Sequence, residues 1–173
     1  MTFLSGVDGC KAGWLSITKN IINGRIESKI FLTAEDLVDQ EILPQIIAID
    51  IPIGLTDSGQ RVCDNLARKI LGEPRRRSVF PAPVRPSLTA RTRQEADIIS
   101  LSIDGRGVGV QAWGLYEKIR EIDQLLITHP LLRRILFEVH PELSFMAWNE
   151  SVAISDNKKT PDGKLARTDL VIL

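Results

Sequence analysis

The sequence has 173 residues, a length that fits one domain around a single core and leaves no room for a second full domain. Apolar residues make up 43% and charged residues 25%, as in ordinary globular proteins, and no apolar run is long enough to cross a membrane. Basic and acidic residues number 22 each, so the zero net charge argues against a strong general attraction to nucleic acid.

The first residues lack the basic and long apolar segments of a signal peptide, so we expect a cytoplasmic protein with no membrane partner. Cys10 and Cys63 are too few for a disulfide framework and lack the spacing of zinc ligands. We interpret both as reduced thiols. Oligomeric state is left open by these residues.

The N-terminal third predicts an antiparallel meander of three strands, Phe3–Val7, Trp14–Thr18 and Arg25–Leu32. Asn23-Gly24, a strong hairpin turn signal, separates the second strand from the third. Thr33 is a good helix N-cap and Pro44 a helix terminator, so we expect a helix between them.

Ile46–Ile51 is almost entirely apolar, which is typical of a central strand covered on both faces. Because a helix is expected between it and the meander, this strand should run parallel to the first strand. Asp8 and Asp50 would then emerge at the same edge of one sheet, each followed at once by a chain-breaking Gly or Pro. Two carboxylates so placed can share a divalent cation.

The middle of the chain predicts helices over Gln60–Leu71, Thr89–Ser102 and Gln111–Ile127. A loop is expected from Arg75 to Pro86 because three prolines interrupt it. The first of these helices should bury one apolar side, made of Val62, Leu66, Ile70 and Leu71.

Ile135–Val139 predicts a last strand, and Pro141 is expected to open a helix. Leu165–Leu173 is apolar and compatible with a helix, but it stops without a capping signal. That pattern suggests either a truncated chain or a short final helix. We therefore expect a single domain over 1–173, with a helical and loop insert at about 56–134 and an incomplete C-terminal helix.

Positive charge is concentrated between Arg61 and Arg93, where nine basic residues stand against two acidic ones. Guanidinium groups bind phosphates, so this segment is a candidate nucleic-acid contact. The candidate substrate-binding residues are Arg61, Arg68, Arg75, Arg76 and Arg77. A solvated charged face is the simpler interpretation of the arginine run, and Arg61, Asp64 and Arg68 would equally suit an ion-pair network on one helix side.

Several segments in this order resemble the domain-of-unknown-function (DUF) 429 family, whose members are described as predicted nucleases of the RNase H-like fold. The matching segments are GVDGCKAGW, AIDIPIGL, RVCDNLAR, RRRSVFPAPVR, GVGVQAW and EVHPELSF. The resemblance implies an α/β protein with a mixed five-stranded sheet, a three-stranded antiparallel meander plus two parallel strands, flanked by helices.

RNase H-like nucleases hold two divalent metals with acids from the first strand, the fourth strand and elsewhere. By motif position the resemblance gives these roles to Asp8 and Asp50, with Glu138 as the third metal ligand and His140 as a further catalytic candidate. It implies an Mg²⁺- or Mn²⁺-dependent hydrolase acting on phosphodiester bonds, because Mg²⁺ prefers hard oxygen ligands and paired metals activate water.

Two alternatives stay open. In the families that the chain resembles, a further acid comes from a C-terminal helix, and here only Asp169 lies on a plausible late helix, outside any acidic motif. This favours a non-catalytic RNase H-like module. A nucleotide-binding phosphotransferase of the actin-like and sugar-kinase group also has a first-strand Asp before a Gly turn, but it binds nucleotide between two such lobes.

Overall fold

The computed structural model describes residues 2–172 and divides into two compact units. The first unit comprises the chain up to residue 54 together with 109–139, and the second comprises 55–108 and the chain from 140 onward. The prediction of one domain with an insert at 56–134 stays a prediction, although residues 109–134 group with the first unit. Over residues 2–172, the helices are too short or too polar to cross a membrane.

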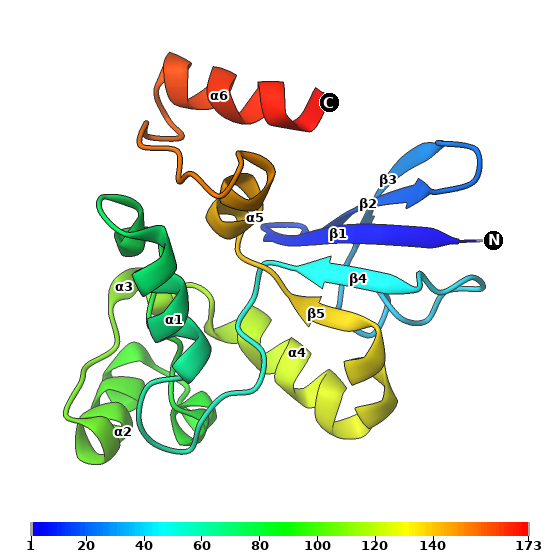
Figure 1. Cartoon of the computed structure of the whole chain (residues 1–173). Helices are drawn as coiled ribbons and strands as arrows, with labels where there is room; N and C mark the ends of the chain where they lie inside the picture. The colour runs from blue at the N-terminus through cyan, green and yellow to red at the C-terminus, as the bar shows by residue number, and fades with distance from the viewer. Residues whose placement is uncertain (1, 173) are drawn as a thin grey trace. The chain divides into compact units, whose positions relative to one another are not determined.

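The first unit contains a five-stranded sheet (Figure 1). Its strands are β1 Phe3–Cys10, β2 Gly13–Asn20, β3 Ile26–Phe31, β4 Ile46–Ile49 and β5 Leu136–Glu138. The spatial order is β3-β2-β1-β4-β5, with β1, β2 and β3 antiparallel and with β1, β4 and β5 parallel. This arrangement confirms the predicted α/β architecture with a mixed five-stranded sheet.

Two glycines make the meander possible. Gly24 adopts a φ of +73° in the β2–β3 turn, where its N–H donates to the Asn20 carbonyl at 2.9 Å. Gly13 opens β2 with a φ of +133°, and a Cβ there would lie 2.0 Å from the Phe31 carbonyl oxygen. A residue with a side chain at position 13 would therefore push β3 away from β2.

One face of the sheet is covered by the helical segment of the first unit, which consists of α3 Val110–Trp113, α4 Tyr116–Thr128 and η3 Pro130–Arg134. The central contact joins β2 to α4, because the fully buried Trp14 donates its indole N–H to Glu121 Oε2 at 2.8 Å. The side chains of Ile119 and Ile122 are equally buried. The single helix predicted for this region is divided at Gly114, which interrupts the pattern of helix-favouring side chains.

The opposite face of the sheet is apolar but exposed. Because side chains alternate along a strand, residues one step from the buried ones fall on this face. They include Leu15, Ile17, Ile26, Ile30, Ile46 and Phe137, each more than a third exposed. The prediction that Ile46–Ile51 would be covered on both faces is therefore wrong for Ile46, which is 44% exposed.

The helix predicted between Thr33 and Pro44 is absent, and residues 32–43 form turns and bends. Thr33 and Asp36 bond each other reciprocally: the Thr33 N–H donates to Asp36 Oδ2 at 2.9 Å, and the Asp36 N–H donates to Thr33 Oγ1 at 3.2 Å. This reciprocal pair is the capping box that starts a helix. The turn that it opens continues only to the bonds from the Val38 and Asp39 N–H groups to the Glu35 carbonyl, so the segment stops after a single turn. The Thr33 N–H and hydroxyl also hold the pKa of Asp36 below its usual value.

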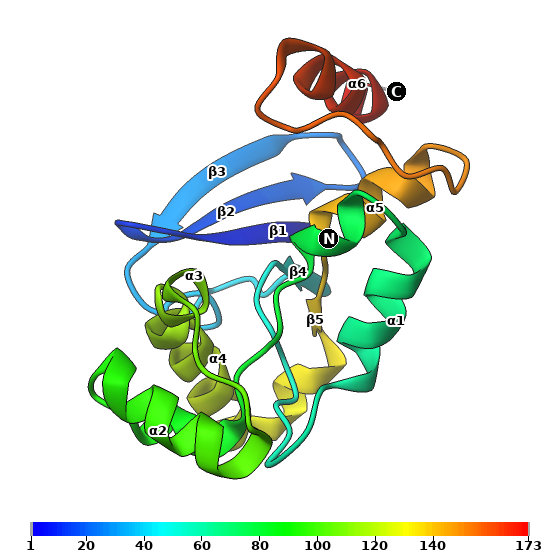
Figure 2. The same ribbon diagram turned by 90° about the vertical axis from the view of Figure 1, so that its left-hand side faces the viewer.

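Six helical elements make up the second unit: α1 Val62–Leu71, η1 Arg75–Ser78, η2 Arg85–Thr89, α2 Arg93–Asp104, α5 Pro141–Trp148 and α6 Pro161–Ile172 (Figure 2). Part of the predicted loop at 75–86 thus forms short 3-10 turns. A small core joins α1 to the residues after η1 and to α5; it consists of Ala67, Leu71 and Val79, with Leu143 and Met146 against them.

The predicted apolar side of α1 is confirmed for Leu71 but wrong for its other three members. The helix buries Asp64 and Ala67 beside Leu71, whereas Val62, Leu66 and Ile70 are 82%, 54% and 49% exposed. The physical reason is a buried ion pair, because Asp64 accepts two hydrogen bonds from the Arg61 guanidinium. Satisfying these two charges fixes the rotation of the helix and leaves its apolar stripe facing outward.

Candidate functional site

Asp8 and Asp50 follow the last paired residues of two neighbouring parallel strands. Val7 in β1 is in register with Ile49 in β4, and the Asp50 N–H donates to the Val7 carbonyl at 3.2 Å. Backbones of adjacent strands lie about 4.8 Å apart. The structure therefore brings the two aspartates to the same edge of the sheet, in neighbouring positions.

Strand alternation decides which way Asp8 faces. Val7 is buried under the helical side of the sheet, so Asp8 lies on the opposite face, where its cross-strand partner is Leu15. Asp8 is exposed and Asp50 is half-buried. The first carboxylate is therefore accessible to a ligand in solution, and the second stands beside it at the point where Pro52 ends the strand pairing.

Glu138 is placed differently from the two aspartates. It is in register with Ile49, so strand alternation puts it on the face of the buried Ile49 and not on that of Asp8. Its Oε2 accepts a hydrogen bond from the Ile53 N–H at 2.8 Å. One oxygen of Glu138 therefore holds the bend that follows Asp50, and the role of Glu138 as a metal ligand stays a prediction.

Within residues 2–172, no three His, Cys, Asp or Glu side chains converge closely enough to hold a metal ion by themselves. The arrangement at this edge offers a pair of carboxylates. Such a pair fits Mg²⁺, which keeps several waters and is usually held by one or two carboxylates together with substrate phosphate.

His140 lies in the second unit as the N-cap residue of α5. Its Nε2 is 3.2 Å from the Ser78 carbonyl oxygen, so Nε2 carries the proton in that bond. Its Nδ1 is buried, and no hydrogen-bond partner is found for it in the part of the chain that the structure describes. The His140 ring therefore links α5 to η1 through Nε2, and its Nδ1 makes no hydrogen bond to the described residues.

The five candidate arginines differ in their partners. Arg61 and Arg68 bond groups inside the second unit: Arg61 is 5% exposed and paired with Asp64, and Arg68 donates from Nε to the Val79 carbonyl at 3.1 Å. Arg76 and Arg77 are exposed, and each lies 3.6 Å from a Glu73 oxygen.

Arg75 differs from the other four arginines. Its Nε is buried without a hydrogen-bond partner, and no carboxylate among the described residues lies within ion-pair distance of its guanidinium. The binding roles of the five arginines stay predictions, but only Arg75 combines a buried donor with an uncompensated charge.

Sequence reasoning missed one buried pair in the second unit. Arg167 in α6 donates from one nitrogen to both oxygens of Glu142, at 3.0 and 2.7 Å, and the two residues are 7% and 6% exposed. Glu142 stands in the EVHPE segment, but its distance of 25 residues from Arg167 hides the pair in the sequence. For Asp64, the spacing from Arg61 did indicate an ion pair as one alternative.

The chain matches the model of a known protein family. A family model described as a protein of unknown function, DUF429, matches residues 6–172, which is nearly the whole chain. No curated protein and no solved structure matches the chain.

Proposed function

The chain belongs to the DUF429 family, and on that premise we propose that it is a metal-dependent phosphodiesterase acting on nucleic acid. One observation carries the proposal: Asp8 and Asp50 follow directly the register pair of Val7 and Ile49 on adjacent parallel strands. Ending two apolar strands on carboxylates at one edge has no packing benefit, since a like charge nearby disfavours the ionised form of an aspartate.

Asp8 and Asp50 would hold Mg²⁺ or Mn²⁺ through carboxylate oxygens. When bound, such an ion supplies an activated water and stabilises the leaving oxygen of the phosphodiester. The exposure of Asp8 leaves room for a substrate phosphate to complete the ligand set. Glu138 contributes by holding the Ile53 N–H, which fixes the chain direction just after Asp50.

The basic segment from Arg61 to Arg93 supports a nucleic-acid substrate in this proposal. Arg76 and Arg77 are 56% and 84% exposed at their side chains, and their ion pairs with Glu73 are long and solvated. Exposed pairs of this kind are weak, so the guanidinium groups can exchange Glu73 for a phosphate. A cytoplasmic location is part of the same proposal.

Cleavage of labelled single-stranded and duplex oligonucleotides in Mn²⁺ tests the proposal. Asp8→Asn and Asp50→Asn should each lower the rate on the order of 100-fold or more, because they remove a ligand charge while keeping the side-chain shape. Asp39→Asn is the matched control, because this aspartate is also exposed and lies in the first unit, in the connection between β3 and β4. Cleavage by Asp8→Asn at the wild-type rate would refute the assignment.

A non-catalytic module is the second candidate, and one observation favours it. No three-ligand group exists among residues 2–172, and Asp169 is an exposed residue of α6. Titration with Mn²⁺ separates the two functions. Intact folding with no Mn²⁺ bound at millimolar concentration supports the module, whereas binding that is lost in both Asp8→Asn and Asp50→Asn supports the enzyme.

A further inference from the structure

Three buried side-chain nitrogens in the second unit have no hydrogen-bond partner among the described residues. They are Nε of Arg75 on η1, Nδ1 of His140 at the start of α5, and Nε of Arg167 on α6. Each is a side-chain nitrogen without a hydrogen-bond partner in the described part of the chain, and Arg167 is only 7% exposed. Leaving a buried polar atom unpaired costs free energy. The two arginine nitrogens lack an acceptor, and Nδ1 of His140 becomes a third donor when the ring is protonated, because Nε2 already donates to Ser78.

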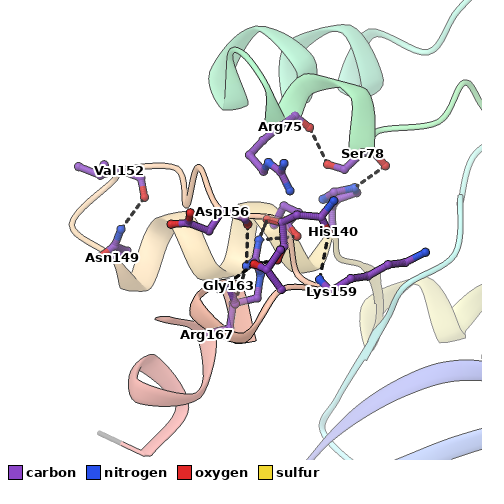
Figure 3. A network of polar contacts seen from close by, with 12 residues as sticks. Arg75, Ser78, His140, Asn149, Val152, Asp156, Lys159, Gly163 and Arg167 are labelled. Atoms are coloured by element: carbon purple, nitrogen blue, oxygen red, sulfur yellow. Dashed lines mark hydrogen bonds and ion pairs between the residues drawn. The ribbon is translucent and has the colours of Figure 1, made fainter. Parts of the chain in front are cut away.

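Contacts within the second unit bring these elements together. His140 Nε2 bonds the Ser78 carbonyl of η1, and Arg167 bonds Glu142 in the first turn of α5. Ser78 in turn donates its hydroxyl to the Arg75 carbonyl at 2.6 Å. Figure 3 shows the Arg75 side chain descending from η1 toward His140 and toward the side chain of Arg167.

The charges around this place are not balanced. Glu142 compensates Arg167, and the other terminal nitrogen of Arg167 is taken by the Gly163 and Asp156 carbonyls. The ion pairs found among residues 2–172 do not include Arg75, which is half-buried. The site therefore carries a positive charge without an ion-pair partner, together with unpaired side-chain nitrogens from three different elements.

We propose that Arg75, His140 and Arg167 form a binding site for a phosphate group. A tetrahedral oxyanion has enough oxygens to accept from separate donors that approach from different sides, and guanidinium groups are the preferred partners of phosphate. Protonated His140 donates from Nδ1 while Nε2 keeps its bond to Ser78. A bound water would satisfy one nitrogen but would leave the charge of Arg75 uncompensated. The site lies wholly in the second unit and requires no metal.

Calorimetric titration of the full chain with inorganic phosphate, in EDTA and at constant ionic strength, tests the site. Wild-type protein should bind phosphate, and Arg75→Gln should weaken binding about tenfold or more. Lys164→Gln, an equal loss of charge at an exposed position of the same unit and outside the basic segment, should leave affinity unchanged. His140→Gln should also weaken binding, because the amide replaces Nε2 but not Nδ1.

Thermal unfolding provides a second measurement of phosphate binding and shows at the same time whether each variant is folded. Phosphate should raise the unfolding midpoint of wild type and of Lys164→Gln in a concentration-dependent way, but not that of Arg75→Gln. Equal stabilisation of Arg75→Gln, or no effect of phosphate beyond that of chloride on wild type, would overturn the proposal. Comparison of inorganic phosphate with adenosine 5′-monophosphate, with adenosine as the control, then identifies the source. Tighter binding of the monophosphate than of inorganic phosphate indicates a phosphate ester, and equal binding of the two indicates the free anion. Because EDTA removes divalent ions, failure here is separate from failure of the metal site.

Discussion

Removing one partner of the Arg61–Asp64 pair should destabilise the second unit severely. The side chains are 5% and 6% exposed, Asp64 accepts two hydrogen bonds from Arg61, and its Oδ2 also accepts from the Ala82 N–H at 3.3 Å. Asp64→Asn keeps the shape but leaves a buried guanidinium without a counter-charge. Breaking a buried pair in this way costs about 3–5 kcal/mol of unfolding free energy.

Urea unfolding followed by circular dichroism measures that cost. Asp57→Asn provides the control, because it makes the same chemical change at an exposed position of the same unit and should cost less than about 0.5 kcal/mol. The double variant Arg61→Met/Asp64→Leu should recover most of the loss, since apolar replacement of both partners is often neutral. A cost below about 1 kcal/mol for Asp64→Asn, or no recovery in the double variant, would refute the structural role of the pair.

Three further changes test the first unit. Glu121→Ala should lower the unfolding free energy by about 2 kcal/mol, because it leaves the buried indole N–H of Trp14 unpaired, whereas Glu121→Gln should cost less; a smaller loss for Ala than for Gln would contradict this. Gly13→Ala should cost about 3 kcal/mol or more through the clash with β3, and a neutral result would mean that the hairpin is built differently. The lowered pKa of Asp36 means that its bonds to Thr33 stabilise the fold above the usual value of 3.8 and lose that effect as pH falls through the lower folded value. Denaturation of wild type and Asp36→Asn should therefore differ at pH 6 and converge in strong acid, and a difference that persists there would contradict the assignment.

Much of the sheet follows from local signals in the sequence. Asn23-Gly24 marks the β2–β3 turn. The predicted parallel direction of β4 is confirmed, although the helix from which it was inferred is absent. The same rules placed Asp8 and Asp50 at one edge. These features depend on backbone geometry and strand alternation, which neighbouring residues largely determine.

The errors concern a helix that stops early and a helix that turns another face inward. The helix expected after Thr33 begins with its capping bonds to Asp36 but ends after one turn, so a start signal alone does not determine helix length. On α1, the stripe of Val62 and Leu66 is turned outward because burial of Asp64 determines the helix rotation. Apolar periodicity carries no information about which charged residue finds a buried partner.

The candidate sites show the same division. Asp8 and Asp50 were found from strand ends, whereas Arg167 was missed because its partner Glu142 is remote in the sequence. For Glu138, strand register with Ile49 sets the face on which the carboxylate lies, and that register depends on pairing across more than eighty residues. Contacts and strand registers between residues so far apart in the sequence are found only in the folded structure.

Anomalous diffraction from a crystal of the full chain soaked in Mn²⁺ tests the shared-cation claim most directly. The account predicts a peak within coordination distance of carboxylate oxygens from both Asp8 and Asp50, and its loss in Asp8→Asn. Full Mn²⁺ occupancy elsewhere with no peak beside these two residues would contradict it.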